Sequence, residues 1–192
     1  MELMIDYITS LDGYGAADGW PGWWGLEDRE YLDWLAENSP DQRTLLMGAN
    51  TYRLMHSFAA SQKESVDALD TASKIVFSNT LSEPLEWENS QLVRGDAVEA
   101  VRELKKHSER PLSTLGSLSL SRSLLAAGLV DRFRVVVFPV ITGKTGQERI
   151  YGGYPDVVLD LVETRTFPGG AQLLDYRPRV LDAPLPPGPG SA

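Results

Sequence analysis

Residues 45–52, Leu45-Leu46-Met47-Gly48-Ala49-Asn50-Thr51-Tyr52, run from an apolar segment through a glycine into a helix-like segment. The same arrangement recurs at residues 115–119, Leu115-Gly116-Ser117-Leu118-Ser119. Both stretches predict a strand-to-helix turn, where the first N–H groups of the helix lack intrahelical partners and the helix dipole favours negative charge. Each turn is therefore either an anion site or an ordinary capped turn. Neither matches G-x-G-x-x-G or the P-loop, so the pattern alone does not choose between them.

Outward from these turns, apolar strand-like segments alternate with amphipathic helix-like segments. The run at residues 133–138 is almost continuously apolar, which is typical of a central strand buried on both faces. Residues 157–167 and 171–176 are predicted to form a closing hairpin through Pro168-Gly169-Gly170. Further strands are expected at residues 3–8, 44–47, 74–78, 91–93 and 112–115, helices at 27–37, 49–58, 97–106 and 116–127, a turn at 10–15 and a glycine-rich loop at 142–153. This order predicts an α/β sheet covered by helices on both faces, with an antiparallel addition at one edge and ligands at the carboxyl ends of the strands.

Length and charge limit the organisation and the partners. The chain has 192 residues, which predicts one domain at residues 1–180 followed by a flexible tail at 181–192. Residues 183–192 contain four prolines and two glycines, which is the basis for the tail. The net charge of −9 argues against nucleic acid as a partner, although a small phosphorylated molecule can still be held by local donors.

The residue types that are scarce exclude several classes of protein. The chain has no cysteine, so it has no disulfides, no thiolate nucleophile and no thiolate metal site. Only two histidines are present, so no metal site is expected. No apolar run approaches the length that spans a membrane, and the amino-terminal residues lack the pattern of a signal peptide. The cytoplasm is therefore the expected compartment.

Four short motifs in a fixed order give the chain a resemblance to a known family. They lie at residues 9–14, 46–52, 76–81 and 128–131, followed by Pro139 and Gly143. In this order and spacing, over about residues 2–177, the chain resembles the dihydrofolate reductase-like superfamily, and in particular stand-alone relatives of the reductase domain of riboflavin biosynthesis. The resemblance implies a dihydrofolate reductase-like three-layer sandwich, with a central, mostly parallel sheet of about eight strands. It also implies a homodimer and NADPH as the hydride donor.

The same resemblance implies where a cofactor lies. The Gly48–Thr51 turn, which includes Ala49 and Asn50, would lie against the cofactor phosphates, and the helix-terminus argument independently favours this position. Gly116, Ser117 and Leu118 would lie against the pyrophosphate. Ser78 and Asn79 would lie near the adenosine 2′-phosphate, and the loop from Ser10 to Asp12 near the nicotinamide.

The chain also departs from the family pattern at four places. The family commonly has a basic residue at the position of Ala49 and often an arginine near Ser78. Because a charge-assisted contact contributes roughly 1.5–3 kcal/mol, these changes predict weaker recognition of the 2′-phosphate, for which Lys74 or Arg53 could compensate. Leu115 replaces a glycine and could crowd the pyrophosphate, and Arg132 replaces the usual acid.

Candidates for substrate binding and proton transfer come from residues 18–28. Trp20, Trp23 and Trp24 could form an aromatic lid over a flat heterocycle, and the alternative is that they fill a satellite core or a dimer interface. Asp28 is a candidate proton donor, and the alternative is an acid that stabilises the first turn of a helix. Asp12 is also open to a structural interpretation, as a turn former.

These observations predict an NADPH-dependent reductase that transfers hydride to a C=N or C=O bond of a small substrate. That substrate would be heterocyclic or similar to a phosphoribosylamino-pyrimidine. One alternative is a non-catalytic nucleotide-binding dimer of the same fold, which Ala49, Leu115 and Arg132 favour. A second alternative is dihydrofolate reduction. The absence of cysteine excludes the zinc deaminase activity of the bifunctional riboflavin enzymes from this chain.

Overall fold

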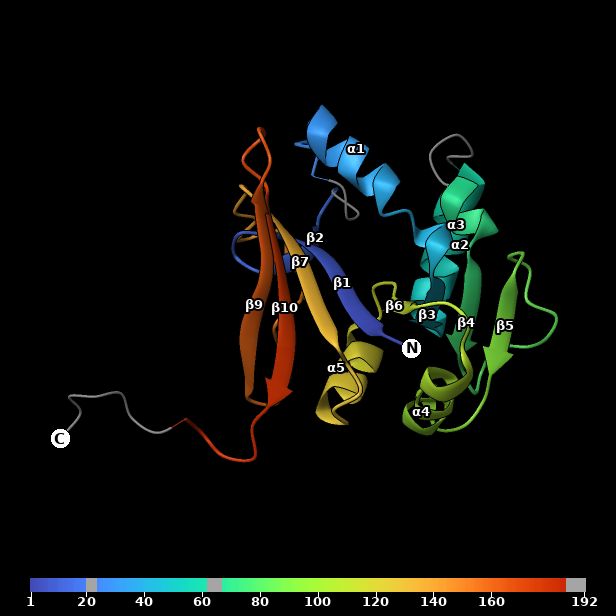
Figure 1. Ribbon diagram of the computed structural model, residues 1–192. Coiled ribbons are helices and arrows are strands. Elements are labelled where there is room, and N and C mark those ends of the chain that lie inside the picture. The colour runs from blue at the N-terminus through green and yellow to red at the C-terminus, as the bar shows by residue number, and fades with distance from the viewer. Residues whose placement is uncertain (20–23, 62–66, 186–192) are drawn as a thin grey trace.

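An eight-stranded sheet forms the centre of the computed structural model, which describes residues 1–19, 24–61 and 67–185 (Figure 1). The strand order is β5-β4-β3-β6-β1-β7-β10-β9. The strands are β1 (Leu3–Ser10), β2 (Tyr14–Ala17), β3 (Thr44–Gly48), β4 (Ser73–Phe77), β5 (Ser90–Val93), β6 (Leu112–Thr114), β7 (Arg132–Phe138), β8 (Gly146–Arg149), β9 (Val157–Thr166) and β10 (Gln172–Val180). The helices are α1 (Arg29–Glu37), η1 (Pro40–Gln42), α2 (Ala49–Ser61), α3 (Asp67–Thr71), α4 (Ala97–His107) and α5 (Leu118–Ala126).

The pairing of the strands is parallel throughout the sheet except at β10. That strand runs antiparallel to both of its neighbours, β7 and β9. The predicted α/β sheet with an antiparallel carboxyl-terminal hairpin is therefore confirmed. The prediction of a central strand at 133–138 is also confirmed, because β7 lies between β1 and β10 and is buried along most of its length.

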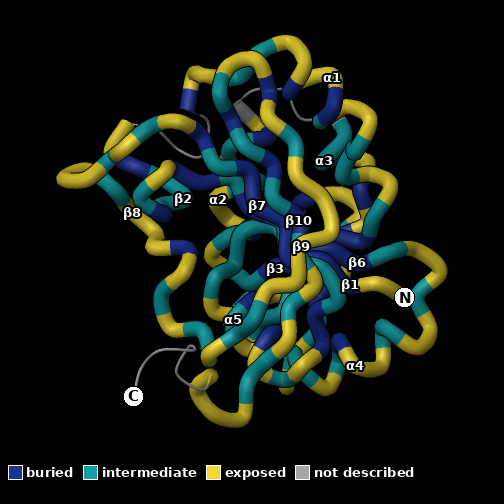
Figure 2. Tube along the Cα trace, turned by 60° about the vertical axis from the view of Figure 1, so that its left-hand side comes forward, coloured by how far each residue is buried: buried dark blue, intermediate teal, exposed yellow. Residues whose placement is uncertain are grey.

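Helices cover the sheet on both faces and produce three layers. Val135 of β7 packs in the cluster that contains α4 and α5, whereas its neighbour Val136 packs in the cluster beneath α1. In β3, Leu46 belongs to the α4–α5 side, and Leu45 packs on the opposite side with α2 and α3. Successive side chains of a strand point to opposite faces, so apolar residues at consecutive positions require cover on both sides. Figure 2 shows the buried residues gathered along the central strands.

The ends of the helices follow ordinary capping chemistry. The Asp96 side chain accepts hydrogen bonds from the backbone N–H groups of Val98 and Glu99 at the start of α4. Gly128, at φ +66°, ends α5 as predicted, because a left-handed residue lets the chain turn away from the helix axis. The N–H groups of Gly128 and Leu129 donate to the carbonyls of Leu125 and Leu124 at 2.9 and 3.1 Å, so the last turn is closed.

One small sheet was not predicted from the sequence. Strands β2 and β8 pair antiparallel, where the sequence analysis expected a turn and a glycine-rich loop. Gly146 allows the pairing, because a Cβ there would lie 2.6 Å from the ring of Tyr14. Each strand has only four residues, which is too short for a periodic pattern, and the two segments lie about 130 positions apart.

Asp12 anchors the turn between β1 and β2. Its carboxylate oxygens accept hydrogen bonds from the backbone N–H groups of Thr142 and Gly143 at 3.1 and 2.8 Å. The Ser10 hydroxyl first, and then these N–H groups, stabilise the charged form and lower the pKa of Asp12 to about 2. The contact joins the segment after β1 to the segment after β7, and it supports the structural interpretation of Asp12.

Two ion pairs join the strands β1, β7 and β10. Arg132 donates from Nε and Nη2 to the two carboxylate oxygens of Asp175 at 2.9 and 2.6 Å. The Asp175 side chain is only 6% exposed. Arg134 pairs in the same way with Asp6, and its guanidinium lies over the ring of Trp34. These bidentate pairs fix β7 against both of its neighbours.

We expect Arg132→Ala to lower the free energy of unfolding by about 2–3 kcal/mol. The substitution leaves the Asp175 carboxylate buried without its cation, and the partial exposure of Arg132 keeps the loss below that of a fully buried pair. Urea denaturation followed by circular dichroism measures the change. Arg29→Ala is the matched control: it removes a pair whose arginine is 95% exposed, and it should change stability by no more than about 0.5 kcal/mol. Equal effects of the two variants would contradict the structural role of the Arg132 pair.

We expect the stability difference between the wild type and Asp12→Asn to depend on pH. A carboxyl group whose pKa is lowered by folding stabilises the protein above its unfolded pKa of about 3.9, and this contribution is lost as the pH falls towards about 2. The difference in melting temperature should be constant between neutral pH and about pH 5 and should narrow below about pH 4. Asp33→Asn, an exposed control on α1, should show a small difference at every pH. A difference for Asp12→Asn that does not change with pH would contradict this account.

Candidate functional site

The carboxyl ends of four parallel strands meet at one edge of the sheet. Val93 of β5, Phe77 of β4 and Gly48 of β3 lie in register, and Leu46 of β3 lies opposite Thr114 of β6. Adjacent strands are about 4.8 Å apart, so the residues that follow these positions are close neighbours. The two turns singled out in the sequence therefore lie side by side, at the starts of α2 and α5.

A hydrogen-bonded clasp joins the two turns. The backbone N–H of Gly48 donates to Ser117 Oγ at 2.9 Å, and Ser117 Oγ donates to Thr51 Oγ1 at 2.8 Å. Ser117 reaches across because its backbone is left-handed, at φ 58° and ψ 57°. The distance between the turns is therefore set by a side chain as well as by the sheet.

Gly48 and Gly116 add no side chain to the space between the turns, where the hydroxyls of Ser117 and Thr51 lie. A Cβ on Gly116 would lie 3.3 Å from Cγ2 of Thr51, and a Cβ on Gly48 would lie 3.9 Å from Ser117 Oγ. The first N–H groups of α2 and α5 have no partners within their own helices, and the two helix dipoles add partial positive charge there. This cradle, lined by N–H and hydroxyl groups, suits the diphosphate of a dinucleotide.

The side chains of Ser78 and Asn79 organise the neighbouring loops. Ser78 Oγ accepts from the N–H groups of Thr80 and Leu81, both at 3.1 Å. Asn79 Oδ1 accepts from the N–H of Gly95 at 2.9 Å and so ties the end of β4 to the end of β5. Both residues lie at the carboxyl edge, as the resemblance implies, and their side chains are already engaged.

Two exposed arginines flank this edge. Arg94 follows β5 directly and donates from Nη2 to the carbonyl of Leu81 at 2.8 Å. Arg53 lies one turn into α2 and donates from Nη1 to Asn50 Oδ1 at 3.4 Å. Arg53 was among the residues predicted from the sequence, and Arg94 was not. The available signal was its position directly after the strand expected at 91–93, where parallel strands present residues to a ligand.

Lys74 does not lie at this edge, so its predicted compensating role is wrong. It is 1% exposed and sits near the amino end of β4. Its Nζ donates to the carbonyls of Leu69, Asp70 and Ala72, and burial lowers its pKa to about 8. Lys74 therefore supplies hydrogen-bond donors to the carbonyls at the carboxyl end of α3.

The loop after β1 presents a different residue from those predicted. Ser10 is fully buried, and its Oγ accepts from the N–H of Tyr14 at 3.0 Å. Asp12 is engaged with the segment after β7, so both side chains are held by hydrogen bonds within the fold. Leu11 is 64% exposed and its N–H donates to the carbonyl of Val140, beside Ile141, which is 71% exposed. Leu11 and Ile141 therefore place two exposed apolar side chains near the carboxyl ends of β1 and β7, and neither was predicted from the sequence.

Asp28 is the N-cap of α1. Its two carboxylate oxygens accept from the backbone N–H groups of Tyr31 at 2.9 Å and Gly169 at 2.5 Å. The Tyr31 N–H, followed by that of Gly169, lowers the pKa of Asp28. An ionised carboxylate that accepts two hydrogen bonds does not donate a proton at neutral pH. This geometry therefore supports the capping interpretation of Asp28 and not the proton-donor one.

The tryptophan lid has one member within the described residues. Trp24 is 2% exposed and packs with Tyr31, Trp34, Phe138 and Phe167 beneath α1. This supports the satellite-core alternative for Trp24. Trp20 and Trp23 lie outside the described residues.

The structure accounts for two of the four departures from the family pattern. Leu115 packs its side chain against the cluster that contains Met47 and Trp87, so it does not fill the space beside Gly116. Arg132 lies at the amino end of β7, at the opposite edge of the sheet, where it binds Asp175. Neither residue therefore argues against a ligand at the two turns.

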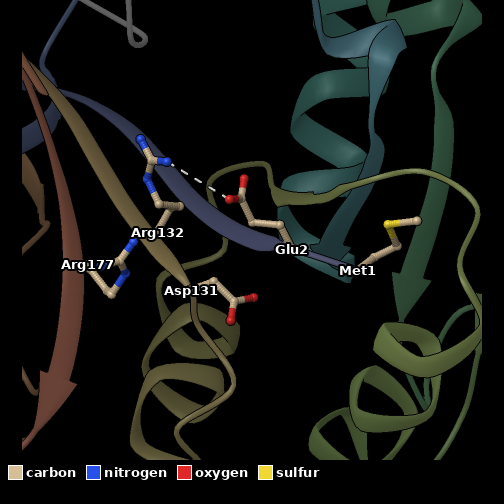
Figure 3. Close-up of a pocket in the computed structure, with 5 residues that line it drawn as sticks. All are labelled: Met1, Glu2, Asp131, Arg132 and Arg177. Atoms are coloured by element: carbon tan, nitrogen blue, oxygen red, sulfur yellow. Dashed lines mark ion pairs between the residues drawn. The ribbon is translucent and has the colours of Figure 1, made fainter. Parts of the chain in front are cut away.

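A separate pocket of about 360 Å³ lies at the amino ends of β1 and β7 (Figure 3). Its lining residues are Met1, Glu2, Asp131, Arg132 and Arg177. Glu2 lies 4.0 Å from Arg132, which also binds Asp175, and Asp131 pairs with Lys105. Most of these charges are therefore neutralised within the fold, and the pocket opens away from the two helix N-termini.

Comparisons with known proteins agree with this architecture. The chain is 28% identical over 184 residues to the uncharacterized protein YyaP of Bacillus subtilis (strain 168), covering 91% of this chain and 94% of that protein. Among solved structures, a putative riboflavin biosynthesis protein from Shewanella sp. PV-4 is similar at a TM-score of 0.71 and 22% identity, covering 93% of this chain and 99% of that one.

A dihydrofolate reductase from Enterococcus faecalis, complexed with NADP(H) and RAB-propyl, is similar at a TM-score of 0.62 and 16% identity, covering 92% and 96% of the two chains. At these identities the solved structures establish the fold, which is dihydrofolate reductase-like as the resemblance implied. The family described as "RibD C-terminal domain" matches this chain over residues 2–173, which is nearly its whole length. With the motifs in family order on the expected fold, the chain belongs to the RibD C-terminal domain family.

Proposed function

We propose that this protein is an NADPH-dependent reductase that transfers hydride to a C=N or C=O bond of a phosphoribosylamino-pyrimidine-like heterocycle. The observation that carries the proposal is the pair of helix N-termini held side by side across the Gly48–Ser117 hydrogen bond. Family membership supports the reaction class. A structural relative from Thermotoga maritima is named a deaminase/5-amino-6-(5-phosphoribosylamino)uracil reductase, and this chain covers 56% of it.

Different residues at the carboxyl edge hold different parts of the cofactor. The first-turn N–H groups of α2 and α5 bind the diphosphate. Ser78, Asn79, Arg53 and Arg94 form the surroundings of the adenosine 2′-phosphate. Leu11 and Ile141 offer an apolar wall for the nicotinamide. The bound nicotinamide supplies the hydride, and the protein contributes position and electrostatics.

Reduction of a C=N or C=O bond also takes up one proton. Asp28 is ionised, and both of its carboxylate oxygens accept backbone hydrogen bonds, so we propose that water supplies the proton. Asp28 was the candidate proton donor for reduction in general, so the dihydrofolate alternative also loses this donor.

A non-catalytic nucleotide-binding protein of the same fold remains the second candidate. One observation favours it: the arginines nearest the expected 2′-phosphate, Arg53 and Arg94, already bond to Asn50 and Leu81. Saturable binding of NADPH without turnover of any 5-amino-6-(5-phosphoribosylamino)uracil-type substrate would select this alternative over the reductase.

We also propose a homodimer, formed through β9 and β10. Leu159 and Leu161 of β9 are 39% and 58% exposed and pair with Pro178 and Tyr176 of β10. On the same face, Leu174 packs against the α4–α5 cluster, but β9 lies at the edge of the sheet and stays largely exposed (Figure 2). A long apolar edge strand is a surface that proteins usually cover, and a second copy of the chain would cover it here.

Gly48→Ala tests the cofactor site. The added Cβ meets only ordinary contact distances in the unloaded protein, but it enters the space between the two turns. We expect unchanged thermal stability and a Kd for NADPH raised roughly tenfold or more, which corresponds to about 1.4 kcal/mol. Quenching of tryptophan fluorescence measures the Kd. Gly152→Ala, at a glycine outside both turns with similar space around it, is the control and should bind as the wild type does. Absence of saturable NADPH binding by the wild type would overturn the proposed function.

Leu161→Lys tests the dimer. A charge at this exposed apolar position should convert the dimer into a folded monomer, because the interface would have to bury an unpaired ammonium group. Light scattering coupled to gel filtration measures the molar mass. Leu54→Lys, at a similarly exposed leucine on α2 (56%), is the control and should stay dimeric. A monomeric wild type, or a dimeric Leu161→Lys variant, would contradict the proposed interface.

A further inference from the structure

The two hydrogen bonds of the clasp run in one direction, from Gly48 through Ser117 to Thr51. The Gly48 N–H can only donate, so Ser117 Oγ accepts from it at 2.9 Å and sends its own proton to Thr51 Oγ1 at 2.8 Å. Thr51 Oγ1 accepts that bond and keeps one proton to donate. Within the described part of the chain, Thr51 Oγ1 donates no hydrogen bond. The series therefore ends in an unused donor.

The surroundings of Thr51 leave this donor open to a ligand. Thr51 is half-buried on the first turn of α2. A Cβ at residue 116 would lie 3.5 Å from Thr51 Oγ1, so a glycine at that position leaves the hydroxyl uncovered. The hydroxyl therefore lies in the same space that the first N–H groups of α2 and α5 surround.

The backbone conformation of Ser117 is energetically unfavourable for a residue with a side chain. A non-glycine residue with a φ of 58° is uncommon, because its Cβ crowds the backbone. In this conformation its hydroxyl reaches the β3–α2 turn and donates a hydrogen bond to Thr51 Oγ1. Without Ser117, the Thr51 side chain could rotate and donate to a carbonyl three or four residues back, at Gly48 or Met47, as threonines on helices often do.

We propose that Ser117 is a positioning residue that orients the Thr51 hydroxyl as a donor to the diphosphate of the cofactor. The inference rests on the proposed function, since it names how that site recognises its ligand. Ser117 acts through Thr51 and keeps its own hydroxyl between Gly48 and Thr51. Hydrogen bonds in series polarise one another, so the terminal Thr51 proton becomes a better donor to an anionic oxygen. This neutral donor stands beside Ala49, where the family commonly has a basic side chain.

The test is a double-mutant cycle on NADPH affinity. Ser117→Gly removes the hydroxyl and relieves the left-handed strain, and Thr51→Val removes the terminal donor while keeping the shape of the side chain. We expect each to raise the Kd for NADPH roughly tenfold, the size of one lost hydrogen bond to a charged group. Because the two hydroxyls act in series, the double variant should bind no more weakly than Thr51→Val alone. Thr51→Ser, which keeps the hydroxyl, should bind within about twofold of the wild type.

Two further measurements separate positioning from structural damage. Thermal melting of each unloaded variant checks that the fold is intact. Adenosine 2′-monophosphate, which has no diphosphate bridge, should compete for the site equally well in all variants. Wild-type affinity for NADPH in Ser117→Gly, additive losses in the double variant, or equal losses for adenosine 2′-monophosphate would overturn the inference while leaving the reductase proposal intact. A wild type that does not bind NADPH would overturn both.

Discussion

The parallel pairing of β3 between β4 and β6 is the constraint on which the arrangement of the site depends. It sets Phe77, Gly48 and Thr114 at the same edge of the sheet, so that three chain segments from distant parts of the sequence turn there together. Parallel strands need long crossover connections, and here those connections are the helices whose N-termini meet at the edge. The same pairing thus builds the core and aims the free N–H groups of α2 and α5 at a common space.

Charge is distributed in a way that suits this arrangement. The chain carries a net charge of −9, yet the space between the two turns is lined by N–H and hydroxyl groups. The bidentate cation–anion pairs lie elsewhere, on β1, β7 and β10, where Arg132 and Arg134 hold Asp175 and Asp6. Arginine therefore stabilises the sheet on the side away from the turns, and backbone dipoles provide the local positive potential at the site. Helix termini can do this in an acidic protein because their effect falls off within one turn.

The elements that could be predicted from the sequence are those with a strong local signal. The apolar run of β7, the amphipathic pattern of α4 and the glycine after α5 can each be recognised within a short stretch of sequence. All three are found in the structure. The β2–β8 pair was missed because its two four-residue strands are joined only by contacts between distant segments. The compensating role of Lys74 and the proton-donor interpretation of Asp28 are not supported for a related reason. A charged side chain near a motif can bind backbone groups of another element, and those partners are not visible in the sequence.

The pattern of apolar residues, glycines and caps was enough to specify an α/β sheet and the two strand-to-helix turns, because these depend on backbone preferences that act over a few residues. The order of the strands, the clasp from Gly48 through Ser117 to Thr51 and the burial of Ser10 and Trp24 came only with the folded chain. Each of these depends on which distant groups come within a few ångströms of one another. Hydrogen bonds and packing act only at such short range, so folding had to bring the partners together before their roles could be assigned.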